Sequence, residues 1–221
     1  ESRHPGFKAG DQVVGMLGSQ EWARSDGTML RKVDTTRVPL SAYLGVVGMP
    51  GVKLHAPIPR PAKNILCVGK NYHEHAKEFH NSGFDASASK DAIPEVPIMF
   101  TKWPNSVIAQ GEPIPSYLDY TNSTDYEGEL TVVIGEAGRG IAKKDAFDHV
   151  YGYTIINDAT ARTLQNRHKQ WFLGKSLDSY CPMGPCIVTS DEIKDVTKLR
   201  LITKVNGELR QDALVSQLIF D

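Results

Sequence analysis

A proline-rich stretch constrains the fold of this chain more than any other feature of its sequence. The segment HAPIPRPAK, from His55 to Lys63, places three prolines within five residues. Proline fixes φ and lacks a backbone N–H, so this stretch is extended and excludes a helix. We therefore predict a junction here, between a small β-rich segment over residues 1–53 and a larger domain over residues 54–221.

Composition and charge exclude several classes of protein. Lys and Arg number 25 against 26 Asp and Glu, and 40% of the residues are hydrophobic, as in an ordinary globular protein. This balance lacks the basic excess of a nucleic-acid-binding protein, and no apolar run approaches the roughly 20 residues of a membrane span. The three cysteines are scattered (Cys67, Cys181 and Cys186), which favours a reducing, cytoplasmic setting over a disulfide framework.

Hydrophobic patterning predicts an α+β, β-rich fold. Short apolar or β-branched runs predict strands, and an Asn206–Gly207 pair predicts a hairpin turn after the last of them. Predicted strands lie in or at Gln12–Leu17, Asn64–Gly69, Ile98–Thr101, Leu130–Ile134, Tyr151–Ile156, Ile187–Val188 and Leu199–Val205. Predicted helices cover Val38–Val47, Tyr72–Phe79 and Thr160–Trp171, and Asn81–Pro97 is polar enough to be a loop.

Three carboxylates stand out as candidate metal ligands. Glu127 and Glu129 are two apart in a predicted strand, so their side chains share a face, and Asp158 follows a buried strand. An all-oxygen set suits Mg²⁺ or Mn²⁺, less well Ca²⁺, and disfavours zinc. The pair could equally be a solvated strand face, and Asp158 could instead cap the following helix.

Two further elements are candidates for proton transfer and charge stabilisation. His75 and Glu78 are spaced i, i+3 on a predicted helix, where the carboxylate would orient the imidazole and raise its basicity. Without other signals, an incidental surface pair explains them as well. Lys175 lies in a Gly-Lys-Ser tripeptide whose upstream residues do not form a phosphate-binding loop, so it is either a lone cation near an anionic site or a surface lysine.

The motifs from about Leu54 to Asp221 together resemble the fumarylacetoacetate hydrolase family. They occur in the order and spacing typical of the family and are NILCVGKNYHEHAKE, PIMFTKWPNSV, DYEGELTVVIG, YGYTIINDATARTLQ, FLGKSLDSYCPMGP and KVNGELRQD. The likeness is strongest to the branch of small acylpyruvases, oxaloacetate decarboxylases and hydroxyheptadienedioate isomerases. It implies a mixed β-roll with peripheral helices, a homodimer, and Mg²⁺ or Mn²⁺ as cofactor.

The resemblance also implies roles for individual residues. It places the metal on Glu127, Glu129 and Asp158, and the water-activating pair on His75 and Glu78. It further implies that Lys175 is the active-site lysine, and that Lys102, Arg162 and Gln165 lie at or around the substrate pocket.

The implied activity is that of a divalent-metal-dependent hydrolase or lyase acting on 2-oxo acids. The cation would stabilise an enolate during acylpyruvate C–C hydrolysis or oxaloacetate decarboxylation. A 2-hydroxyhepta-2,4-diene-1,7-dioate-type isomerase and a catalytically inactive, truncated or fused remnant are the alternatives.

Two departures from the family pattern bear on these expectations. The family extends several dozen residues past a segment such as Gln217–Asp221, so we expect a β-roll that is incomplete at its C-terminal end. Residues 5–52 instead resemble a fragment of the zinc-free, NADP-dependent medium-chain reductases, although the glycine-rich turn that binds a dinucleotide is absent from the sequence.

Overall fold

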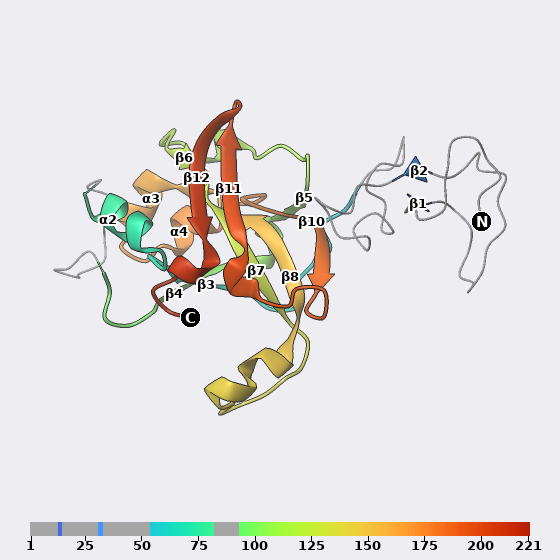
Figure 1. The fold of residues 1–221 in the computed structure, drawn as a ribbon. Coiled ribbons are helices and arrows are strands. Elements are labelled where there is room, and N and C mark those ends of the chain that lie inside the picture. Colours follow the sequence, from blue (N-terminus) through green and yellow to red (C-terminus); the bar gives the residue numbers. More distant parts are fainter. Residues whose placement is uncertain (1–12, 15–30, 33–53, 82–92) are drawn as a thin grey trace. The chain divides into compact units, whose positions relative to one another are not determined.

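The computed structural model describes residues 13–14, 31–32, 54–81 and 93–221, and it divides the chain into two compact units. The first unit covers Glu1–Lys53, and its described part is one antiparallel pair of short strands, β1 (Val13–Val14) and β2 (Arg31–Lys32). The helix predicted over Val38–Val47 lies outside the described residues. The second unit covers Leu54–Asp221 and holds all the candidate site residues (Figure 1).

The second unit is strand-rich, with few and short helices, so it has the α+β character that the sequence predicts. Its largest sheet has the strand order β5–β10–β8–β7, in which β5 runs parallel to β10 and the other neighbours are antiparallel. The strands of this sheet are β5 (Val107–Ala109), β7 (Gly128–Ile134), β8 (Val150–Asn157) and β10 (Cys181–Thr189).

Three two-stranded sheets hold the other strands among the described residues of this unit. They pair β3 (Ile65–Gly69) with β4 (Ile98–Lys102), β6 (Thr124–Asp125) with β9 (Thr160–Ala161), and β11 (Arg200–Val205) with β12 (Glu208–Leu214). In the β11–β12 hairpin, Asn206 and Gly207 both have positive φ angles, 52° and 86°. Such a turn matches the twist of its strands, so the predicted hairpin is confirmed.

The three labelled α-helices lie together on one side of the unit (Figure 1). The α-helices are α2 (His73–Asn81), α3 (Arg162–Arg167) and α4 (Phe172–Lys175). Short 3₁₀ helices are Pro104–Ser106, Ser116–Leu118, Lys143–His149, Val196–Lys198 and Val215–Gln217. None of the helices in the described part of the chain combines the length and the apolar character needed to cross a bilayer.

The prediction of one helix over Thr160–Trp171 is wrong. Thr160 and Ala161 form strand β9 against β6, and α3 begins only at Arg162. Lys169 has a φ of 57°, a left-handed conformation that separates α3 from α4. Pairing with β6 therefore overrides a sequence pattern that is permissive for a helix.

Two small clusters of buried side chains hold these elements together. One joins the largest sheet to the start of the unit and contains Ala56, Ile156, Cys181 and Met183. The other lies under α3 and contains Ala159, Ala161, Leu164 and Tyr180. The segment between Ile156 and Ala161 thus links both clusters, and Asp158 lies within it.

Candidate active site

The candidate site is built where β7 begins and β8 ends. These strands are antiparallel neighbours, so Glu127, just before β7, and Asp158, just after β8, come together. The backbone N–H of Asp158 donates to the carbonyl oxygen of Glu127 at 2.7 Å, and the Asn157 side-chain oxygen accepts from the Glu127 N–H at 3.0 Å. Two acidic residues that are 31 positions apart are thereby fixed side by side.

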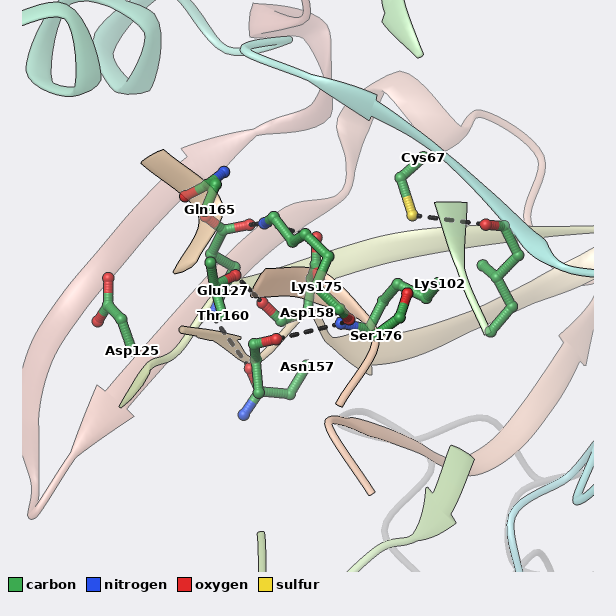
Figure 2. Close-up of polar contacts among 12 residues, drawn as sticks. Cys67, Lys102, Asp125, Glu127, Asn157, Asp158, Thr160, Gln165, Lys175 and Ser176 are labelled. Carbon is green, nitrogen blue, oxygen red and sulfur yellow. Dashed lines mark hydrogen bonds and ion pairs between the residues drawn. The ribbon is translucent and has the colours of Figure 1, made fainter. Parts of the chain in front are cut away.

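Lys175 bridges these two acids (Figure 2). Its Nζ lies 2.6 Å from Glu127 Oε2 and 2.9 Å from Asp158 Oδ2, and the side chain is 2% exposed. Helix α4, which carries Lys175, packs closely on α3. A Cβ at Gly174 would lie only 2.5 Å from the backbone nitrogen of Gln165. The alternative of a surface lysine is therefore wrong.

The charge of Lys175 is stabilised by its neighbours. Burial alone would lower the pKa of the Lys175 ammonium, but the adjacent Asp158 and Glu127 carboxylates outweigh burial and raise it. Lys175 is therefore a fixed cation at neutral pH and a hydrogen-bond donor rather than a base.

Lys102 holds Asp158 from the other side. Its Nζ lies 2.6 Å from Asp158 Oδ1, donates to the Ala159 carbonyl oxygen at 3.1 Å, and also donates to the Lys175 carbonyl oxygen. The Lys102 side chain is fully buried, so it holds protein groups of the site in place and does not face solvent. Asp158 does not cap a helix, because α3 begins four residues later and its N-cap position is Ala161.

Arg162 connects the first acid to a further carboxylate. Its guanidinium lies 2.6 Å from Glu127 Oε1 and 2.7 Å from Asp125 Oδ2. It also donates to the buried Gln165 side-chain oxygen at 3.3 Å, one turn along α3. The structure thus brings Arg162 and Gln165 to the acidic cluster and adds Asp125, a member of the DYEGE motif that was not among the predicted site residues.

Glu129 is the acid of this cluster whose charge is least compensated. Burial, together with the nearby Glu127 and Asp158 carboxylates, raises its pKa to about 8, and Lys175 only partly opposes this shift. Within the described ranges, its carboxylate makes no hydrogen bond or ion pair with another side chain. Asp125, Glu127, Glu129 and Asp158 thus face three cations, so the cluster carries an excess negative charge once Glu129 ionises.

This excess charge is what a divalent cation would neutralise. The donors are carboxylate oxygens, which hard ions such as Mg²⁺ and Mn²⁺ prefer. In the part of the chain that the structure describes, no three His, Cys, Asp or Glu side chains are spaced to hold a metal ion as they stand, since Lys175 contacts two of the three candidate ligands. The residues therefore fit a divalent cation in donor chemistry, but not in the spacing they have beside Lys175.

The predicted proton-transfer pair lies on α2. The side chains of His75 and Glu78 lie outside the described residues, but the helix backbone is described from His73 to Asn81. Burial and, secondarily, the Glu129 carboxylate raise the pKa of Tyr72, which immediately precedes α2. The start of this helix is therefore within electrostatic reach of the acidic cluster.

A loop anchored by Asp119 supports α3, and the sequence analysis missed it. The buried Asp119 carboxylate accepts from the backbone N–H groups of Thr121 and Ser123, at 3.0 and 2.7 Å. Ser123 in turn accepts from the backbone of α3, through its carbonyl oxygen from Arg162 N and through its hydroxyl from Thr163 N. The D-Y-T-N-S pattern of an Asp followed by Thr and Ser is the signal that could have revealed this turn.

Residues 64–221 match the family described as fumarylacetoacetate (FAA) hydrolase C-terminal. The chain belongs to the fumarylacetoacetate hydrolase family. This confirms the resemblance stated for the larger domain. The reductase resemblance of residues 5–52 finds no support in the comparisons, and most of that segment lies outside the described residues.

Relatives within the family are similar over about three quarters of the chain. Oxaloacetate tautomerase YisK of Bacillus subtilis is 54% identical over 169 residues, which are 76% of this chain and 54% of that protein. An uncharacterised protein of Staphylococcus epidermidis is 43% identical over 159 residues, 72% of this chain and 49% of its own length. The chain thus spans about half the length of the curated relatives it matches.

Solved structures of the family share the fold. A fumarylacetoacetate hydrolase from Exiguobacterium antarcticum is 45% identical, with a TM-score of 0.64 over 77% of this chain and 57% of that one. A 2-hydroxyhepta-2,4-diene-1,7-dioate isomerase from Mycobacterium marinum is 33% identical, with a TM-score of 0.60 and the same coverage. The family therefore includes members named for hydrolysis, isomerisation and tautomerisation.

Proposed function

We propose that this chain carries the active site of a divalent-metal-dependent enzyme that acts on 2-oxo acids, with oxaloacetate as the first candidate substrate. The observation that carries the proposal is the buried cluster in which Lys175 pairs with both Glu127 and Asp158. Glu129 lies near this cluster, and its charge is only partly compensated by Lys175. The 54% identity to an oxaloacetate tautomerase directs the choice of substrate.

We assign the divalent cation to Glu127, Glu129 and Asp158. When bound, Mg²⁺ or Mn²⁺ would act as a Lewis acid on the oxygens of a 2-oxo acid and favour loss of a proton from the neighbouring carbon. Lys102 and Arg162 keep two of these acids in place, since each already makes a short ion pair with one of them.

The remaining residues of the site bind substrate and move protons. Lys175 is a fixed ammonium, so it would stabilise negative charge that develops on the substrate rather than accept a proton. Gln165 would donate its amide N–H to a substrate carboxylate. We assign proton transfer to His75 and Glu78, because α2 begins next to Tyr72, which is sensitive to the Glu129 charge.

The same residues could serve three related reactions. In tautomerisation, a proton moves between the C3 carbon and the C2 oxygen of oxaloacetate. In decarboxylation, the C3–C4 bond breaks and CO₂ leaves, and in acylpyruvate hydrolysis, water attacks the distal carbonyl. A hydroxyheptadienedioate-type isomerisation is the fourth candidate, and one solved relative carries that name. Homodimer formation, a cytoplasmic location and closure of the strands into a β-roll accompany the proposal as further predictions.

The test is an assay on oxaloacetate and on an acylpyruvate, with Mg²⁺ or Mn²⁺ and with chelator. Absorbance follows the enol, and pyruvate analysis separates tautomerisation from decarboxylation. Glu127→Gln should lower turnover on the order of a thousandfold, because Lewis-acid stabilisation contributes several kcal/mol. Glu208→Gln, which alters an exposed glutamate of β12, is the matched control and should behave as wild type.

Two results would contradict the proposal. One is turnover that is unaffected by chelation, and the other is equal activity of the Glu127→Gln and Glu208→Gln variants. Mn²⁺ binding without turnover of either substrate class would instead indicate the non-catalytic alternative.

A further inference from the structure

Gln211 contacts the candidate site from the β11–β12 hairpin, which contributes none of the acidic residues of the site. It lies in β12 opposite Thr203 of β11, at the point where the hairpin register shifts between Thr203 and Lys204. A register shift of this kind bends a strand and changes the direction of nearby side chains. The β11–β12 hairpin lies against β7, the strand that begins between the two glutamates (Figure 1).

The Gln211 amide binds both backbone polar groups of Gly128. Its Oε1 accepts from Gly128 N at 2.8 Å, and its Nε2 donates to the Gly128 carbonyl oxygen at 3.4 Å. Because β7 is an edge strand of its sheet, Gly128 directs these groups away from β8. Gln211 therefore takes the place of a neighbouring strand at this one residue.

The opposite edge of the same segment is held by β8. The Asp158 N–H donates to the carbonyl oxygen of Glu127, and Glu129 pairs with Ile156 in the ladder. The segment Glu127–Glu129 is thus fixed from both sides, by β8 at the two glutamates and by Gln211 at the glycine between them.

Gly128 has no side chain where the hairpin approaches. A Cβ there would lie 2.2 Å from Thr203 Oγ1 and 3.2 Å from Gln211 Oε1. Strand alternation places Glu127 and Glu129 on the face opposite this Cβ position. The hairpin therefore packs on the back of the segment and the two carboxylates project from its front.

We infer that Gln211 is a positioning residue that fixes the relative placement of the Glu127 and Glu129 carboxylates for the divalent cation. This inference rests on the proposed function. Gln211 acts through the Gly128 backbone and does not touch the cation itself. Residues that orient metal ligands in this indirect way commonly affect metal affinity by about 10- to 100-fold.

The experiment compares Gln211→Met with a matched control, Gln217→Met, in the full chain. Gln217 Oε1 also accepts a backbone N–H at 2.8 Å, from Leu214, but it lies exposed at the end of the 3₁₀ helix Val215–Gln217. Methionine keeps the length of the side chain and removes its hydrogen bonds. The readouts are the Mn²⁺ dissociation constant, from the EPR signal of free Mn²⁺, and the thermal unfolding midpoint without metal.

We expect Gln211→Met to bind Mn²⁺ about tenfold more weakly than wild type, and Gln217→Met to bind as wild type does. Equal dissociation constants for the two variants would overturn the inference while leaving the proposed function intact. A wild-type chain that binds no Mn²⁺ would overturn the proposed function, and this inference with it.

A second variant keeps the inference testable if Gln211→Met does not fold. Gln211→Glu retains an oxygen that can accept the shorter bond from Gly128 N. Its dissociation constant for Mn²⁺ should be at most about threefold above that of wild type, since its added negative charge also attracts the cation. A tenfold loss in Gln211→Glu would contradict the role of the Gly128 bond.

Discussion

Two lysine–aspartate pairs in the same unit have the same length and different surroundings. Lys102 lies 2.6 Å from Asp158, and their side chains are 0% and 3% exposed. Lys143 also lies 2.6 Å from Asp221, but these side chains are 79% and 82% exposed. Water screens the second pair almost completely, whereas the first depends on partners supplied by the protein. Distance alone therefore does not show which ion pairs matter, and burial does.

The largest expected effect is at the buried pair. Lys102→Met leaves Asp158 Oδ1 and the two carbonyl oxygens that Lys102 contacts without their donor. Breaking a buried pair on one side costs about 3–5 kcal/mol, so we expect a loss of that size in the free energy of unfolding. Urea denaturation measures it, and a loss below about 1 kcal/mol would contradict this account.

Asp119→Asn should have the next largest effect. Asp119 accepts several hydrogen bonds while buried, and loss of charge-assisted bonds costs about 2 kcal/mol. Burial opposes ionisation of Asp119, but the bonds from Thr121 and Ser123 outweigh it and lower its pKa below the ordinary 3.8. The contribution of the Asp119 charge to the free energy of unfolding is therefore complete above about pH 3.8 and is lost as the pH falls through the lowered pKa.

The difference in stability between wild type and Asp119→Asn should accordingly shrink on acidification below that pH. Asp195→Asn is the matched control, since Asp195 accepts similar bonds from Thr197 in an exposed turn. It should leave the unfolding midpoint unchanged. A constant difference between wild type and Asp119→Asn down to pH 2 would show that the Asp119 charge is not involved.

Glu129→Gln should stabilise the metal-free protein while weakening metal binding. Because the pKa of Glu129 is raised from 4.5 to about 8, the folded chain holds a proton there that the unfolded chain releases, and stability falls as pH rises through this range. The glutamine variant avoids this loss, so at pH 8 with chelator it should be at least about 1 kcal/mol more stable. A variant less stable than wild type at pH 8 would mean that Glu129 has a compensating partner.

The smallest effect is expected at the exposed pair. Lys143→Met removes an ion pair that is short but solvated. We expect no measurable change in the urea midpoint, in contrast to Lys102→Met at the same distance. A clear destabilisation by Lys143→Met would break the comparison between the two pairs.

Local patterns predicted the regular strands well, and tertiary contacts explain what they missed. The runs at Leu130–Ile134 and Tyr151–Ile156 lie within β7 and β8, because β-branched and aromatic residues suit a sheet. By contrast, β12 has the sequence ELRQDAL, whose polar residues give no strand signal of their own, so only the predicted hairpin turn indicated this strand. It forms because the turn at Asn206–Gly207 returns the chain onto β11.

For the candidate site, the sequence singled out several of the residues that the structure brings together but not how they are held. The shared face of Glu127 and Glu129 follows from strand periodicity, and the family resemblance added Lys102, Arg162 and Gln165 and a site role for Lys175. Asn157 and Gln211 were missed, because each acts on a backbone group of a residue distant in sequence. The metal assignment and the roles of His75 and Glu78 stay predictions.

The bond from Lys102 to the main-chain oxygen of residue 175 has a consequence for engineering. Every amino acid offers that carbonyl, so the support beneath α4 does not depend on the identity of the side chain at this position. The side-chain cation that faces Glu127 and Asp158 can thus be changed, for example to a shorter amine, without removing the bond from Lys102 to the backbone at position 175.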